Sequence, residues 1–248
     1  MRGLALVTGG SRRVGRAIAL ELARASLDLV LTFREDERGA EATAEEARAL
    51  GASVRVDRCD LARAEQVEGI ACSIAEGEGR LDVLVHNASV YRPSPLGTLV
   101  ADEATSVFAV NAIAPLHLSA RLAPLLSASS LPGGGSIVAM SDIHASHVPR
   151  RNHAAYLMSK GALEVMVRAL ARDLAPRVRV NGVAPGVVAF GETGIDADPE
   201  VRRAYLARVP LGRSGTPEEA ASVVRWLALE ATYVTGEVVR VDGGRSLG

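Results

Sequence analysis

The feature that most constrains the fold is a repeated alternation of short apolar runs with longer stretches of helical spacing. The pair recurs about seven times along the chain, which is typical of a doubly wound α/β protein, with about seven parallel strands and helices on both faces of the sheet. We expect strands at 4–7, 27–33, 53–56, 81–85, 136–140, 177–183 and 238–241. We expect helices at 14–25, 38–50, 63–76, 105–127 with an interruption near Pro115, 154–175, and 217–229 with Thr216 as N-cap.

Composition narrows the class of protein. The chain has 248 residues with 48% hydrophobic and 3% aromatic residues, so its core must consist mainly of Ala, Leu and Val. No composition break divides it, and we expect one domain over 1–248, with the irregular segment 186–213 as a substrate loop. The formal net charge is −1 with mixed signs, which argues against nucleic acid or a polybasic membrane contact.

Cysteine usage and hydropathy indicate the cellular compartment that we expect for the protein. Cys59 and Cys72 belong to no CxxC pair or Cys/His cluster, so we expect two reduced thiols and no metal site. No apolar run reaches about 18 residues. The first strand follows Met1 so closely that no signal peptide fits before it. We therefore expect a cytoplasmic protein.

A glycine-containing turn, VTGGSRRVGRAIA at 7–19, joins the first strand to the first helix. Small residues let backbone amides approach a phosphate, and the helix dipole favours the anion there. The turn predicts a dinucleotide site, and a plain β–α turn is the alternative. The residues expected to contact the dinucleotide are Gly9, Ser11, Arg12, Arg13, Val14 and Gly15.

The chain contains 27 Arg and a single Lys, Lys160, which lies four residues after Tyr156 on a predicted helix. Residues at this spacing share one helix face. An ammonium group near a phenol favours the phenolate, so we expect Lys160 to lower the pKa of Tyr156 from its usual value of about 10. The pair predicts proton-transfer chemistry, and an exposed helix pair is the alternative.

These motifs resemble the short-chain dehydrogenase/reductase family over essentially the whole chain. The resemblance implies a Rossmann-type fold, a nicotinamide cofactor and hydride transfer. It assigns proton transfer to Tyr156 and Lys160, a water relay to Asn111, and contacts to the ribose to Lys160. Further cofactor contacts are implied at Asp60, Leu61, Asn87, Ala88, Ser89, Tyr156, Pro185, Gly186 and Val188.

Four departures from the family pattern resemble its pteridine reductase branch. Arg13 takes the place of the middle glycine, where it would reach both cofactor and substrate, and Ser89 follows Asn87-Ala88. Tyr91 falls where an aromatic ring would stack on a pterin. Asp142 aligns with the catalytic serine. Asp142 precedes Tyr156 by one residue more than is usual, so an insertion lies within 148–152 or Ser141 is the functional group.

The cofactor prediction is NADP(H). The strand at 27–33 ends without an acidic residue to bind a ribose 2′-hydroxyl, and Arg34 follows it. An arginine in this place suits a 2′-phosphate. Glu35-Asp36 would face the ribose if the strand ended later than expected.

Three functions follow. The first is an NADPH-dependent reductase of dihydropterins or dihydrofolate, with Asp142 and Tyr156 protonating the ring nitrogen. The second is a carbonyl reductase of 3-oxoacyl thioesters or sugars that uses Ser141, and the third is an idle nucleotide-binding protein. The apolar face of 154–175 also suggests a homo-oligomer, a tetramer or a dimer.

Overall fold

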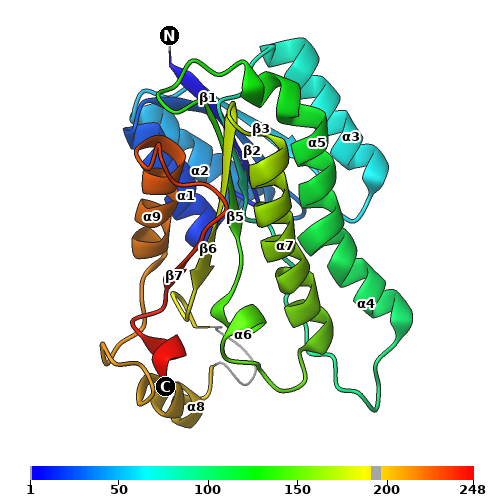
Figure 1. The fold of residues 1–248 in the computed structure, drawn as a ribbon, viewed down its shortest axis with the longest axis vertical. Coiled ribbons are helices and arrows are strands. Elements are labelled where there is room, and N and C mark those ends of the chain that lie inside the picture. The colour runs from blue at the N-terminus through cyan, green and yellow to red at the C-terminus, as the bar shows by residue number, and fades with distance from the viewer. Residues whose placement is uncertain (1, 191–196) are drawn as a thin grey trace.

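The computed structural model describes residues 2–190 and 197–248, and its seven strands form one parallel sheet (Figure 1). The strand order is β3-β2-β1-β4-β5-β6-β7. The strands are β1 (Gly3–Thr8), β2 (Leu27–Phe33), β3 (Val54–Arg58), β4 (Val83–His86), β5 (Gly135–Met140), β6 (Val178–Pro185) and β7 (Val238–Val241). The predicted doubly wound α/β architecture is therefore confirmed.

Helices cover both faces of the sheet and enclose two apolar cores (Figure 1). One layer contains α1 (Arg13–Arg24), α2 (Glu37–Ala49) and α9 (Pro217–Leu229), and the other contains α3 (Ala64–Ser73), α5 (Ala114–Ser127) and α7 (Ala154–Asp173). Alternate residues of β1 serve the two cores, with Ala5 and Val7 in one and Leu4 and Leu6 in the other. This period of two is the reason for the short, wholly apolar strands.

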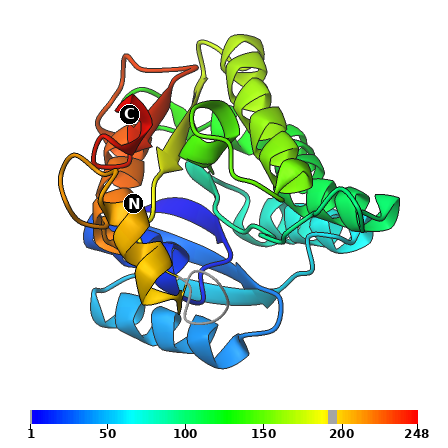
Figure 2. The ribbon, with the colours of Figure 1, turned by 90° about the horizontal axis from the view of Figure 1, so that it is seen from below.

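The strand order reverses between β1 and β4, which pair side by side although two strands separate them in the chain. In such sheets the ligand crevice lies beyond the carboxyl ends at this reversal. Here the Thr8 hydroxyl accepts hydrogen bonds from the Asn87 and Ala88 amides at 3.0 and 3.1 Å. Figure 2 looks onto this edge of the sheet, where α6 (Ile143–Ser146) and α8 (Pro199–Leu206) also lie.

The helix predicted at 105–127 begins earlier and is interrupted close to the expected place. It comprises α4 (Ala101–Phe108), the π-helical turn η2 (Ala109–Ile113) and α5. Pro115 lacks an amide hydrogen, so the regular hydrogen-bond pattern cannot pass through it. A second π-helical turn, η1 (Ile74–Glu78), follows α3.

Helices α6 and α8 were missed. All of α8 lies within 186–213, which the sequence analysis treated as irregular; residues 191–196 of that segment lie outside the described residues. The signal for α8 was present, because Asp198 accepts from the Glu200 amide at 2.8 Å and Pro199 occupies the first turn. The same pattern was recognised at Thr216-Pro217, which does open α9 with a capping box.

One helical stretch of the described residues reaches the length and mean hydropathy of a membrane-spanning helix, although the sequence contains no uninterrupted apolar run of that length. By length and composition alone, the helical stretch Ala101–Ser127 is sufficient, with a hydropathy of 1.2 in its most apolar window. Half of that window is buried within the protein, as in the core helices that pass the same test.

Candidate active site

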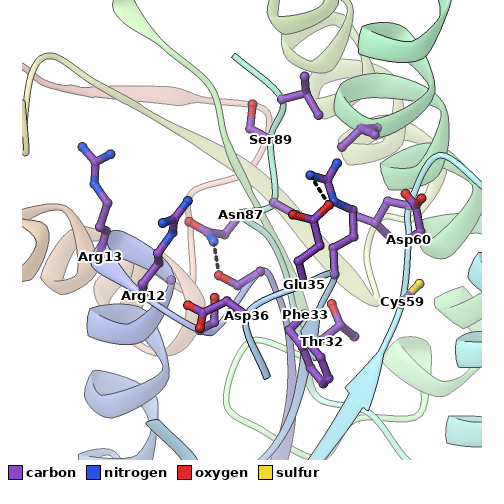
Figure 3. A pocket seen from close by; sticks show the side chains of 18 of the residues that line it. Arg12, Arg13, Thr32, Phe33, Glu35, Asp36, Cys59, Asp60, Asn87 and Ser89 are labelled. Atoms are coloured by element: carbon purple, nitrogen blue, oxygen red, sulfur yellow. Dashed lines mark hydrogen bonds and ion pairs between the residues drawn. The ribbon is translucent and has the colours of Figure 1, made fainter. Parts of the chain in front are cut away.

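A cavity of about 490 Å³ lies beyond the carboxyl ends of β1, β2, β3 and β4 (Figure 3). Arg12 and Arg13 lie at one end of it, and Cys59 and Asp60 at the other. Twelve of the predicted cofactor contacts line it: Gly9, Ser11, Arg12, Arg13, Val14, Gly15, Arg34, Asp60, Leu61, Asn87, Ala88 and Ser89. Cys59, Val90 and Val110 were not foreseen, since their apolar contacts have no sequence motif.

The glycine-containing turn is shaped by two close approaches. A Cβ on Gly15 would lie 2.0 Å from the Gly9 carbonyl oxygen, and Gly9 itself has a φ of +68°. The Asn87 side-chain amide donates to the Thr8 and Gly9 carbonyls at 3.0 and 2.9 Å. These contacts shape the turn, and Val14 and Gly15 at the start of α1 line the cavity.

Arg13 has a φ of 51°, which explains why the family pattern has glycine in its place. Its guanidinium donates to the Ala189 carbonyl on the segment that follows β6. Arg13 therefore links the glycine-containing turn to the start of the predicted substrate loop. The predicted contacts of Arg13 with cofactor and substrate stay predictions.

The end of the cavity formed by the residues after β2 and β3 contains mixed charges. Arg34 forms an ion pair with Glu35 at 2.9 Å, while Asp36 caps α2 by accepting from the Gly39 amide at 3.0 Å. Asp60 accepts from the Ala62 amide at 3.0 Å and so shapes the turn before α3. Burial, with neighbouring carboxylates, raises the pKa of Cys59 to about 11, so this thiol stays neutral.

Tyr156 and Asp142 meet at the start of α7. The Tyr156 hydroxyl donates to Asp142 Oδ2 at 2.8 Å, and Asp142 Oδ1 accepts from the His144 amide at 2.8 Å. The Ser141 hydroxyl instead donates to Glu164 Oε1 at 2.8 Å. The structure thus brings Asp142 to Tyr156 and directs Ser141 elsewhere.

The expected effect of Lys160 on Tyr156 is wrong for this structure. Burial first, and then the Asp142 carboxylate, raise the pKa of Tyr156 well above its ordinary value. Lys160 Nζ lies 5.9 Å from the Tyr156 ring centroid and donates to the Met140 carbonyl at 2.6 Å. Burial lowers the pKa of Lys160 to about 8, against the opposing effect of Asp142. Tyr156 is therefore held as a neutral phenol.

Asn111 lies in η2, and its side chain is fully engaged with protein groups. Its Oδ1 accepts from the Ser89 hydroxyl at 3.2 Å and the Val90 amide at 2.8 Å. Its Nδ2 donates to the Val90 carbonyl at 2.9 Å and the Ser159 hydroxyl at 3.0 Å. Asn111 thus ties the segment after β4 to α7, and its role in a water relay stays a prediction.

Tyr91 places an aromatic ring beside the Tyr156–Asp142 pair. It meets Tyr156 edge to face, with ring centroids 4.8 Å apart, and stacks on His153 at 4.7 Å. The Arg150 guanidinium lies 5.5 Å from the Tyr91 ring centroid. Tyr91 is 42% exposed, so part of its surface is accessible to a ligand. His153 and Arg150 were not among the predicted site residues.

Five predicted cofactor contacts are not among the residues that line the cavity: Tyr156, Lys160, Pro185, Gly186 and Val188. Pro185 ends β6, and the Gly186 amide donates to the Val241 carbonyl at 3.0 Å. Val188 is buried in the core. Among the described residues, no group of three or more His, Cys, Asp or Glu side chains could hold a metal ion.

A crevice at the β1–β4 reversal, together with a buried Tyr156–Lys160 pair and the adjacent Asp142, is typical of nicotinamide-dependent oxidoreductases. The family described as "Enoyl-(Acyl carrier protein) reductase" matches residues 9–246. The chain belongs to the short-chain dehydrogenase/reductase family.

Individual relatives agree with this assignment. An uncharacterized oxidoreductase of Methylorubrum extorquens is 37% identical, over 97% of this chain and 96% of the relative. The 3-oxoacyl-[acyl-carrier-protein] reductase FabG of Staphylococcus aureus is 31% identical, over 97% and 96%. The solved structure of acetoin dehydrogenase YohF from Salmonella typhimurium matches with a TM-score of 0.88 at 30% identity, over 100% of this chain and 97% of that one.

Proposed function

We propose that the protein is an NADPH-dependent reductase that converts a dihydropterin, or dihydrofolate, to its tetrahydro form. The hydrogen bond from Tyr156 to Asp142 is the observation that carries this proposal. A carboxyl group beside a phenol suits a ring C=N bond, because the nitrogen must gain a proton as the adjacent carbon gains hydride. The partly exposed ring of Tyr91 adds a flat surface for a planar heterocycle.

The chemistry balances across the C=N bond. When bound between the glycine-containing turn and the Tyr156–Asp142 pair, NADPH would supply the hydride that the carbon gains and would thereby be oxidised to NADP⁺. Tyr156, kept neutral by burial and by Asp142, holds the proton that passes to nitrogen. Asp142 orients the Tyr156 hydroxyl and can accept a hydrogen bond from a ring N–H of the substrate. The Lys160 ammonium is held in place by its hydrogen bond to the Met140 carbonyl. Solvent then restores the proton.

The residues around the cavity support the preference for NADPH. Gly9 and Gly15 leave the space that a pyrophosphate requires, since a Cβ on Gly15 would strike the Gly9 backbone. Arg12 and Arg34 face the cavity, and Thr32 and Phe33 stand where an NAD-specific acid is expected.

Arg34→Ala tests this preference. We expect the Kd for NADPH to rise about 10-fold or more, because a hydrogen bond to a charged group contributes about 1.5–3 kcal/mol. The Kd for NADH should change little. Fluorescence titration measures both, and Arg172→Ala, an exposed residue near the end of α7, controls for the loss of charge. Equal weakening of NADH and NADPH binding would contradict the role of Arg34.

A carbonyl reductase is the second candidate, and the comparisons support it better than the pterin proposal. FabG is named for a 3-oxoacyl substrate and the Salmonella structure for acetoin, both of which are carbonyl compounds. In this structure the hydroxyl of Ser141 is bonded to Glu164, so Tyr156 and Asp142 would have to act on the carbonyl as well.

A substrate panel separates the two candidates. NADPH oxidation should be followed with 7,8-dihydrobiopterin, dihydromonapterin, dihydrofolate, acetoacetyl thioester and diacetyl in parallel. Turnover of a pterin with no turnover of the carbonyl compounds supports the proposal. Turnover of a carbonyl compound alone supports the second candidate and overturns the first.

Asp142→Asn then tests the proton-delivery pair with whichever substrate is turned over. We expect kcat to fall about 100-fold or more, the usual effect of removing a general acid–base group. The Kd for NADPH should remain unchanged, because Asp142 is not among the cavity-lining residues. An unchanged kcat would exclude Asp142 from the reaction.

A further inference from the structure

The turn that carries Asp142 is short and needs external support. Ser141 precedes Asp142 directly, and Ser146 is the last residue of α6. Asp142 caps this helical turn through the His144 amide. Four residues of helix have little stability of their own, so the direction of the Asp142 carboxylate depends on what holds the turn.

Glu164 contacts both sides of that turn. Its Oε1 accepts from the Ser141 hydroxyl at 2.8 Å, and its Oε2 accepts from the Ser146 hydroxyl. Glu164 lies on α7 four residues after Lys160 and eight after Tyr156, so the three share one helix face. Helix α7 therefore carries both Tyr156 and the carboxylate of Glu164, which holds the turn that bears Asp142.

Stability alone does not account for this carboxylate. Glu164 is 7% exposed, and no ion pair within 2–190 and 197–248 includes it. A buried carboxyl group must have its oxygens hydrogen-bonded, whereas an apolar side chain of similar size would need no such partners. The two serine contacts give the carboxylate its reason to be there.

We propose that Glu164 is a positioning residue, which holds both ends of the Ser141–Ser146 turn and so aims the Asp142 carboxylate at Tyr156. The inference rests on the proposed role of the Asp142–Tyr156 pair in proton delivery. Neither the burial of Glu164 nor the family motif predicts this role.

Two substitutions separate positioning from charge. Glu164→Leu removes both contacts, and we expect kcat to fall about 10- to 100-fold, since a small misplacement of a reacting group has an effect of this size. In Glu164→Gln the amide oxygen accepts from one serine and the amide NH₂ donates to the other. This variant should keep kcat within about threefold of the wild type. If kcat fell as much in Glu164→Gln as in Glu164→Leu, the charge of Glu164, and not its two hydrogen bonds to the turn, would be responsible for its effect.

A double-mutant cycle tests whether Glu164 acts through Asp142. In the Asp142→Asn background, Glu164→Leu should cause no further fall in kcat, because there is no longer a carboxylate to aim. A second fall of the same size would show that Glu164 acts independently, and would overturn the proposal. If Glu164→Leu does not fold, Ser146→Ala removes one of the two contacts and should give a smaller fall with the same dependence on Asp142.

Alkaline titration provides a readout that needs no substrate. Tyrosinate absorbance, after subtraction of a Tyr156→Phe variant, reports the ionisation of Tyr156. Asp142 opposes the ionisation of Tyr156 while the Ser141–Ser146 turn is held in place. Tyr156 should therefore ionise at a lower pH in Glu164→Leu than in the wild type, and at the same pH in Glu164→Gln as in the wild type. Coincident curves for Leu and wild type would overturn the positioning role even if the proposed substrate proved correct, and the predicted shift would support it even if pterins were not turned over.

Discussion

At the scale of single residues, burial affects the pKa values of Tyr156 and Lys160 more than the attraction between the two groups does. Tyr156 is 6% exposed and Lys160 is 3% exposed, so each is pushed toward its neutral form. The motif predicted that the two residues share a helix face, and they do. It could not predict the depth of their burial, nor that Asp142 would lie against the phenol.

Lys160 should give stability a measurable pH dependence. Its pKa is about 8 when folded and about 10.4 when unfolded, so between these values the unfolded chain binds more protons. The free energy of unfolding should therefore rise with pH across this window, by up to about 3 kcal/mol. Below about pH 8 this gain is absent, because Lys160 is charged in both states.

Urea unfolding of the wild type and Lys160→Met between about pH 7 and about pH 10 checks this expectation. The stability difference between the two proteins should change in favour of the wild type as the pH rises. Parallel curves would mean that Lys160 keeps its charge in the folded state.

At the scale of elements, most strands and long helices begin and end within a few residues of the prediction, because hydrophobic periodicity is sufficient to place them. Helix α9 matches at both ends, helped by its capping box. Helix α6 was missed because Asp142 was considered only as a catalytic group, although its side chain is also the N-cap. Glu164 was missed because a buried carboxylate has no motif, although its spacing placed it on the helix face shared by Tyr156 and Lys160.

The turn between β1 and α1 should tolerate no side chain at Gly15. In Gly15→Ala, the new Cβ would lie 2.0 Å from a backbone oxygen, so we expect a loss of about 1–3 kcal/mol in stability and much weaker NADPH binding. Gly69→Ala is the matched control, since a Cβ there meets nothing within 4 Å.

Because Gly69 lies inside α3, its replacement by alanine should raise the stability by about 0.5–1 kcal/mol. Denaturant unfolding and a cofactor titration of both variants test the pair. If both substitutions shifted stability in the same direction, the close approach at Gly15 would not be the cause.

At the scale of the whole molecule, the sheet places the cavity residues and the Asp142–Tyr156–Lys160 group on different sets of strands. Strands β1–β3 lead to the residues around the cavity, while β5 and α7 carry Asp142, Tyr156 and Lys160. The glycine turn and the Tyr-x-x-x-Lys pair predicted these two parts separately. Only the three-dimensional arrangement shows that Arg13, through Ala189, and Asn111, through Ser159, link distant segments around the site.

We also propose that the protein forms a homo-oligomer through its α7 side, as a tetramer or a dimer. Met158 and Val165 on α7 are 63% and 58% exposed, and Ile113 on the neighbouring turn η2 is 59% exposed. Light scattering should give a mass of two or four chains for the wild type, and a lower mass for Val165→Arg. Leu96→Arg, in an exposed loop, should leave the mass unchanged. A wild-type mass of one chain would overturn the proposal.

The regular spacing of Tyr156, Lys160 and Glu164 also determines which kinds of mutation this region can survive. Each residue inserted into a helix rotates everything beyond it by about 100°. One codon gained or lost between 157 and 163 would therefore turn at least one of the three side chains away from the site, even if every residue type were preserved. The connection at 147–152 lies outside regular helix and can absorb a change in length. In a deletion scan this stretch of α7 should thus be intolerant, while many of its exposed positions accept substitution.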